Sequence, residues 1–192
     1  RGLKSKFLVS DLPFLSHKIS LAHAVHDVKT LLQAGAHAVK IEGADSDTCK
    51  TIEHLVQAGI PVMGHIGLTP QSLHQLGGYK VQGKNQQQAA KLLLQAKSLE
   101  QSGCFALVIE CVPHQLSTEI SKALKIPTIG IGAGNGTDGQ VLVWHDMLGL
   151  QDTFHPKFVK QFAQAKGVLL EALNDYVQQV QTNQFPNSDH SF

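Results

Sequence analysis

Three acidic side chains close short apolar runs in this chain. Glu110 follows Ala106-Leu-Val-Ile, Asp11 ends residues 7–11, and Glu42 ends residues 38–42. Apolar, largely β-branched runs of this length are typical of strands buried in a parallel sheet. In α/β enzymes the catalytic groups lie at the carboxyl ends of such strands. The repeated pattern predicts that the three carboxylates converge on one site.

These carboxylates have the chemistry of a magnesium site. Mg²⁺ prefers oxygen ligands, and it commonly binds one or two carboxylates while keeping waters and taking oxygens from a substrate. Asp11, Glu42 and Glu110 therefore become candidate metal ligands or acid–base groups. The alternative is that these acids pair with lysines such as Lys40 or cap loops.

Two further polar residues are expected near the same edge of the sheet. Lys40 and Glu42 are separated by one residue, so both point to the same face of their strand, which in a barrel can be the interior. A buried lysine beside carboxylates is able to hold the carboxylate of a substrate. His65 lies near the end of the next apolar run. Alternatively, His65 is a histidine of the core whose hydrogen bonds are satisfied and which takes no part in the site.

The elements that would position these residues alternate regularly along the chain. Helical patterns cover about residues 21–34, 48–58 and 86–101, and a long amphipathic pattern covers residues 157–182, followed by an irregular tail. The glycine-rich segment 67–83 reads as a long loop, of the kind that is usually functional, with one short helix at Thr69-Pro70. Six strands are predicted, at residues 7–11, 38–42, 61–66, 106–113, 127–133 and 141–146.

Alternating buried strands and helices predict a parallel α/β fold. A complete (β/α)8 barrel has ~250 residues, or about thirty for each βα unit, so 192 residues hold about six units. Two folds remain open at this point, a six-stranded open sheet and a TIM barrel with six of its eight βα units present. In either case we expect a single domain over residues 1–192.

The overall composition excludes several classes of partner. With 16 basic and 15 acidic residues the formal charge is +1, which argues against nucleic-acid binding. No stretch approaches the ~20 apolar residues of a membrane span, and the first residues do not resemble a signal peptide. Both observations lead us to expect a cytoplasmic location. The three cysteines form no CxxC pair, so we expect buried free thiols and neither a disulfide framework nor a zinc site.

Two apparent motifs fail in context. Residues 134–139 match G-x-G-x-x-G, but a strand-like run follows where a dinucleotide site needs a helix, so we interpret them as a glycine-rich loop. His23 and His26 are spaced for a metal on one helix face, but they have no evident third ligand.

Longer motifs resemble those of the ketopantoate hydroxymethyltransferase family. The resemblance extends over essentially the whole chain and is most specific between Gly64 and Gly83. The matching segments are Asp11-Leu-Pro-Phe14, Val39-Lys-Ile-Glu-Gly43, Gly64-His-Ile-Gly-Leu-Thr-Pro-Gln71, Gly77-Gly-Tyr-Lys-Val-Gln-Gly83, Glu110-Cys-Val-Pro113, Ile129-Gly-Ile-Gly-Ala-Gly134, Thr137-Asp-Gly-Gln140, His145-Asp146 and His190-Ser-Phe192.

This resemblance implies a (β/α)8 barrel that assembles as a homo-oligomer, a decamer in the family. It also implies transfer of a hydroxymethyl group from 5,10-methylenetetrahydrofolate to 3-methyl-2-oxobutanoate through a Mg²⁺-stabilised enolate, which gives 2-dehydropantoate for pantothenate biosynthesis. By the same resemblance, Asp11 and Glu42 bind the metal, Asp11, Lys40 and His65 contact the substrate, and Glu110 is the general base.

The chain departs from the family before residue 7. Family members carry two further βα units there, and the second ends in a Gly-Asp-Ser motif that supplies another metal-binding aspartate and a substrate-binding serine. We therefore expect a missing amino-terminal segment and open barrel edges. Two alternatives follow, a non-catalytic remnant that serves as an assembly module, and another metal-enolate lyase of 2-oxo acids. The segment from Gly64 to Gly83 favours the transferase over the lyase.

Overall fold

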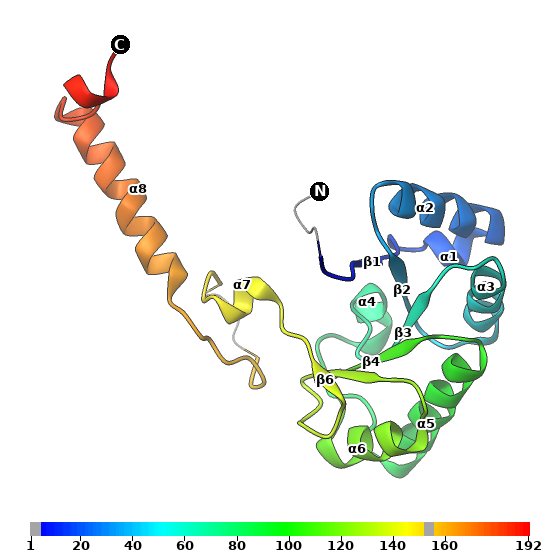
Figure 1. The fold of residues 1–192 in the computed structure, drawn as a ribbon. Helices are drawn as coiled ribbons and strands as arrows, with labels where there is room; N and C mark the ends of the chain where they lie inside the picture. The colour runs from blue at the N-terminus through cyan, green and yellow to red at the C-terminus, as the bar shows by residue number, and fades with distance from the viewer. Residues whose placement is uncertain (1–4, 152–155) are drawn as a thin grey trace. The chain divides into compact units, whose positions relative to one another are not determined.

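The chain folds around one parallel β-sheet. The computed structural model describes residues 5–151 and 156–192, and the chain divides into two compact units, residues 1–141 and 142–192. The sheet belongs to the first unit and has the strand order β1-β2-β3-β4-β5-β6, with every neighbouring pair parallel. Consecutive βα units therefore lie side by side in a curled half-barrel (Figure 1), which confirms the predicted α/β class.

Five of the six predicted strands form where expected. The prediction for residues 141–146 is wrong. The last hydrogen bond to β5 is the one that the Val141 N–H donates to the Gly130 carbonyl, 3.0 Å away. A short helix begins at Trp144. Residues 134–138 form a loop that leads into β6 and does not open a helix directly, which agrees with the interpretation as a glycine-rich loop, although the strand expected after it at residues 141–146 does not form. The strands are β1 (Val9–Asp11), β2 (Ala38–Glu42), β3 (Val62–Gly67), β4 (Ala106–Glu110), β5 (Thr128–Ile131) and β6 (Gly139–Gln140).

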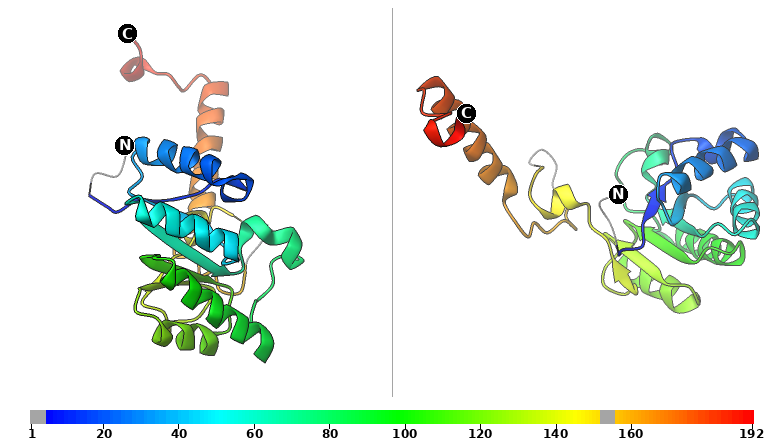
Figure 2. Two further views of the ribbon diagram at one scale, coloured as in Figure 1. Left: turned by 90° about the vertical axis from the view of Figure 1, so that its right-hand side faces the viewer. Right: turned by 45° about the horizontal axis from the view of Figure 1, so that its top comes forward.

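Helices cover the outer face of the curled sheet (Figure 2). They are α1 (Ser16–Ile19), α2 (Leu21–Gln33), α3 (Ser46–Gln57), α5 (Gln86–Gln101) and α6 (His114–Ala123). The side chains of Ser20, Asp45 and Asn85 accept hydrogen bonds from backbone N–H groups in the first turns of α2, α3 and α5. Such caps satisfy N–H groups that have no partner within the helix, so they fix where each helix begins.

The core lies between these helices and the sheet. Along β2 and β4 the side chains alternate between two faces. Val39, Ile41, Leu107 and Ile109 are fully buried in the apolar cluster beneath the helices. The intervening residues of each strand therefore point to the other, concave face, which is the face where Lys40, Glu42 and Glu110 lie.

The second unit contains α7 (Trp144–Met147), α8 (Ala165–Gln181) and the 3-10 helix η2 (Ser188–His190). The predicted helix over residues 157–182 begins only at Ala165. The reason is tertiary: the backbone N–H groups of Phe162 and Ala165 donate to the carbonyls of Met147 and Leu148, at 2.8 and 2.9 Å. Among the residues described, no helix is long and apolar enough to cross a membrane. The expectation of a single domain stays a prediction.

Candidate active site

The structure brings the predicted polar residues together at the carboxyl edge of the sheet. Asp11, Glu42 and Glu110 are the last residues of β1, β2 and β4, and His65 lies within β3. Strand register places Asp11 opposite Lys40 and Glu42 opposite His65. Because the strands are parallel neighbours, this edge collects one or two polar side chains from each of four consecutive units.

These side chains form a continuous row across four strands. Lys40 Nζ lies 2.9 Å from Asp11 Oδ1 on one side and 3.2 Å from His65 Nδ1 on the other. His65 Nε2 in turn lies 3.2 Å from Glu110 Oε2. Along the row an acid is followed by an ammonium, an imidazole and a second acid, and the ammonium of Lys40 is the group suited to an anionic substrate.

Glu42 lies beside the middle of this row. Its Oε1 is 3.9 Å from Lys40 Nζ and 3.7 Å from His65 Nδ1, while its Oε2 accepts a hydrogen bond from the Gln71 N–H at 2.9 Å. Although burial opposes ionisation, the contacts with His65 and Gln71 outweigh it and lower the pKa of Glu42. This carboxylate is therefore ionised at neutral pH.

His65 is buried between two carboxylates, with 2% of its surface exposed. Its Nε2 is within ion-pair distance of Glu110, but the alignment falls short of a hydrogen bond. Burial disfavours the charged ring, yet the carboxylates of Glu110 and Glu42 prevail and raise the pKa of His65. The Lys40 ammonium, 3.2 Å from Nδ1, opposes this rise in the pKa.

Asp11 and Glu42 offer carboxylate oxygens, the type of ligand that Mg²⁺ prefers. Both carboxylates lie within ion-pair distance of Lys40, with side-chain exposures of 64% and 8%. Within residues 5–151 and 156–192 there is no cluster of three or more His, Cys, Asp or Glu side chains that would hold a metal by protein ligands alone. One exposed and one buried carboxylate offer hard oxygen donors of the kind that fits Mg²⁺, which would complete its shell with waters and substrate oxygens.

The segment after β3 packs directly against the acids. The Leu68 N–H donates to the Glu110 carbonyl at 2.8 Å. Gly67 has a φ of +92°, and a Cβ added there would lie 2.1 Å from the same carbonyl oxygen. Only glycine allows this approach. The next residues form the 3-10 helix η1 (Pro70–Ser72) and α4 (Leu73–Leu76), which confirms the short helix expected at Thr69-Pro70.

Gln71 is a site neighbour that the sequence analysis did not single out. Besides its N–H contact with Glu42, its side-chain Nε2 donates to the Leu12 carbonyl at 2.8 Å. The sequence did offer one indication of this role. Gln71 lies in the first turn of the helix predicted at Thr69-Pro70, and the first N–H groups of a helix have no partner within it, so they are free to bond a nearby acid.

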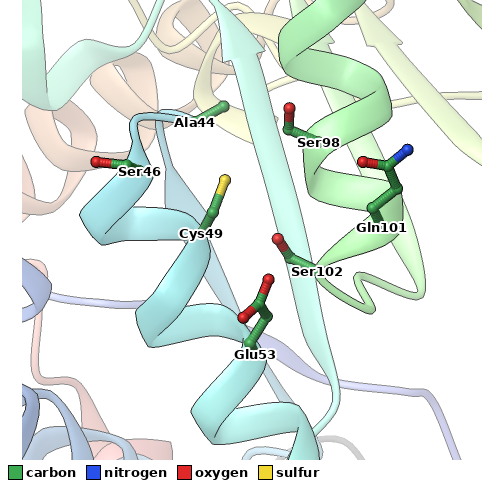
Figure 3. Close-up of a pocket in the computed structure, with 7 residues that line it drawn as sticks. All are labelled: Ala44, Ser46, Cys49, Glu53, Ser98, Gln101 and Ser102. Atoms are coloured by element: carbon green, nitrogen blue, oxygen red, sulfur yellow. The ribbon is translucent and has the colours of Figure 1, made fainter.

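A separate groove of about 390 Å³ opens between α3 and α5 (Figure 3). It contains none of the predicted site residues, so it is distinct from the row described above. Cys49 lines it and is a free thiol, as are Cys104 and Cys111. The remaining polar lining comes from Ser46, Glu53, Ser98, Gln101 and Ser102.

The sequence of the chain identifies its relatives. The family described as ketopantoate hydroxymethyltransferase matches residues 1–188. This chain belongs to that family. A 3-methyl-2-oxobutanoate hydroxymethyltransferase of Legionella pneumophila (strain Philadelphia 1) is 71% identical over 192 residues, which are 100% of this chain and 73% of the relative. The enzyme of the same name from Francisella tularensis subsp. novicida is 49% identical over 100% of this chain and 72% of its own length.

Solved structures agree with the ketopantoate hydroxymethyltransferase assignment at the level of fold. Phosphonopyruvate hydrolase superposes with a TM-score of 0.51 at 11% identity, over 96% of this chain and 64% of that chain. A Burkholderia cenocepacia protein whose assignment as a phosphonomutase is provisional superposes with a TM-score of 0.52 at 10% identity, over 91% of this chain and 68% of that chain. At such low identity the likeness shows the α/β fold alone.

Proposed function

We propose that this chain transfers a hydroxymethyl group from 5,10-methylenetetrahydrofolate to 3-methyl-2-oxobutanoate and so forms 2-dehydropantoate for pantothenate biosynthesis. The observation that carries the proposal is the row of Asp11, Lys40, His65 and Glu110 on four adjacent strands of a hydroxymethyltransferase-family chain. An ammonium flanked by carboxylates matches a small 2-oxo acid and the cation that such an acid chelates.

Each residue in the row has a distinct task. Lys40, held between Asp11 and His65, offers its ammonium to the carboxylate of the 2-oxo acid. Asp11 and Glu42 would hold Mg²⁺, which as a Lewis acid polarises the substrate ketone when bound. The contact between Gln71 and Glu42 keeps the Glu42 carboxylate in place for this task.

Glu110 is the general base of the proposed reaction. Its carboxylate takes the proton from C3 of 3-methyl-2-oxobutanoate, and the enolate left behind forms the new carbon–carbon bond to the one-carbon unit of the folate. His65 lies beside this carboxylate, with Nε2 3.2 Å from Glu110 Oε2. Water supplies the oxygen of the new hydroxymethyl group as both carbon–nitrogen bonds of the folate methylene break. The two folate nitrogens take up one proton from that water and the one that Glu110 removed from C3.

The finer features of the family belong to the same proposal. A closed eight-unit barrel would continue the sheet from its two outer strands, the three-residue β1 and the two-residue β6. A homo-oligomer is supported by the apolar residues Leu169, Leu173, Tyr176 and Val180 at helical spacing along α8. A cytoplasmic location is supported by free cysteines, which persist in reducing compartments.

The test is a proton-exchange assay that needs no folate. The purified protein with Mg²⁺ and 3-methyl-2-oxobutanoate in D₂O should replace the C3 proton, as followed by NMR, and should form product once 5,10-methylenetetrahydrofolate is added. Glu110→Gln should slow both reactions by on the order of 10²-fold or more. The matched control is Glu119→Gln, which changes an exposed acid of α6.

The outcomes separate the alternatives. Unchanged exchange in Glu110→Gln would remove the base role from this residue. Exchange without product on addition of the folate would favour a lyase of 2-oxo acids. A protein that performs neither reaction would favour an assembly module of the same fold.

A further inference from the structure

One residue forms hydrogen bonds to two of the segments that carry the candidate site residues. Gln71 donates its backbone N–H to Glu42 Oε2 at 2.9 Å and its side-chain Nε2 to the Leu12 carbonyl at 2.8 Å. Leu12 directly follows Asp11 and is buried. The two acids expected to share a metal, Asp11 and Glu42, are thus linked through one residue that belongs to neither strand.

The link adds a contact from outside the sheet to the short end of β1. Among the residues that the structure describes, β1 is a three-residue strand that pairs with β2. Beyond the ladder, the end of β1 is held by the bond from the Leu12 N–H to the Lys40 carbonyl, at 3.0 Å. The side chain of Asp11 is 64% exposed and is held by its ion pair with Lys40, at 2.9 Å.

The other end of the link is firmly anchored. The Leu68 N–H donates to the Glu110 carbonyl at 2.8 Å, and Leu68 and Thr69 are buried. The turn that carries Gln71 is therefore fixed to β4, and through Gln71 it fixes the end of β1. A displacement of β1 relative to β2 would have to break the bond from Gln71 Nε2.

From this geometry we infer that Gln71 is a positioning residue for the metal-binding pair, acting through the Leu12 carbonyl to hold Asp11 at a set distance from Glu42. The inference rests on the proposed function of Asp11 and Glu42. A hydrogen-bonding partner outside the ligand set typically changes metal affinity by about 10- to 100-fold when it is removed. Gln71 should therefore affect metal affinity far more than it affects turnover at saturating metal.

The experiment measures binding of Mn²⁺ as the probe, by electron paramagnetic resonance of the free ion, to the full protein freed of metal. Gln71→Met keeps the length of the side chain and removes its donor, so the Kd for Mn²⁺ should rise about 10-fold or more. In turnover assays the Mg²⁺ requirement should rise while kcat at saturating Mg²⁺ stays within about threefold of the wild type.

The control is Gln75→Met, which makes the same change at an exposed position of α4. A Kd within about twofold of the wild type in Gln71→Met would overturn the inference while leaving the proposed function intact. If the wild-type protein itself binds no Mn²⁺, the metal role of Asp11 and Glu42 and the role of Gln71 fail together. Should Gln71→Met not fold, Gln71→Asn is measured in its place. Its side chain is one methylene shorter and its amide no longer reaches the Leu12 carbonyl, so the same rise in the Kd for Mn²⁺ is expected.

Discussion

Gly67→Ala is the sharpest test of how the segment after β3 meets the base. A Cβ at this position would lie 2.1 Å from the Glu110 carbonyl oxygen and 2.8 Å from Val112 Cγ2, so the backbone itself must move. The φ of +92° costs an L-residue about 1–2 kcal/mol, and overpacking adds about 1–3 kcal/mol. The reduced entropy of the unfolded chain offsets about 0.4–1 kcal/mol. We expect a net loss of about 2–4 kcal/mol.

Gly59→Ala supplies the matched control. Gly59 has a similar φ of +85°, but no atom lies within 4 Å of an added Cβ, so only the conformational cost applies. At about 2–4 °C for each kcal/mol in a chain of this size, Tm should fall by about 5–15 °C in Gly67→Ala and by a few degrees in Gly59→Ala. Far-UV circular dichroism is the suitable probe, because Trp144, the single tryptophan, belongs to the second unit. Equal shifts in the two variants would refute the close approach to Glu110.

Two further predictions concern the metal and the buried histidines. Asp11→Asn and Glu42→Gln should each raise the Mg²⁺ concentration needed for half-maximal turnover, and an unchanged metal response would remove that residue from the metal site. Burial lowers the pKa of His17 below 6.5, so the unfolded chain binds more protons and the stability of the metal-free protein is lost as pH falls through this range. His65 has a raised pKa, so its contribution is full below 6.5 and is lost as pH rises through the folded pKa. The free energy of unfolding, measured with urea from about pH 5 to 8, should therefore fall less on the acid side in His17→Gln and less on the alkaline side in His65→Gln than in the wild type. If His17→Gln instead changed the alkaline side and His65→Gln the acid side, the pKa directions given for the two histidines would be wrong.

Local patterns were sufficient to predict the elements that hold the site. β2 was expected at residues 38–42 and α5 at residues 86–101, and both have these bounds in the structure. In β2 the alternation of Val39 and Ile41 with Lys40 and Glu42 specified the two faces, because side chains along a strand alternate whatever surrounds them. The convergence at one edge followed from the parallel order of the strands.

Other features depended on contacts that no local pattern encodes. The run from Val141 to Trp144 has the composition of a strand, but pairing with β5 ends at Gln140. The helical period that begins at Lys157 is interrupted because the backbone of Phe162 bonds to Met147 and not within a helix.

Within the site, residue types were predictable and partners were not. The sequence indicated Lys40 beside acids, but not that the lysine lies between Asp11 and His65. The role of Gln71 depends on a contact 59 residues away in sequence, at Leu12. The metal-binding, substrate-binding and base roles of the row stay predictions until the variants above are measured.

The sequential strand order has a consequence for the way the protein is made. Every residue of the row lies between positions 11 and 110, and each strand pairs with the one synthesised just before it. Elements emerging from the ribosome can therefore dock in the order of their translation, and each new contact closes a loop of modest length, which keeps its entropic cost small. A nascent chain that has reached Glu110 already carries every catalytic side chain proposed here, while residues 142–192 are still to be added.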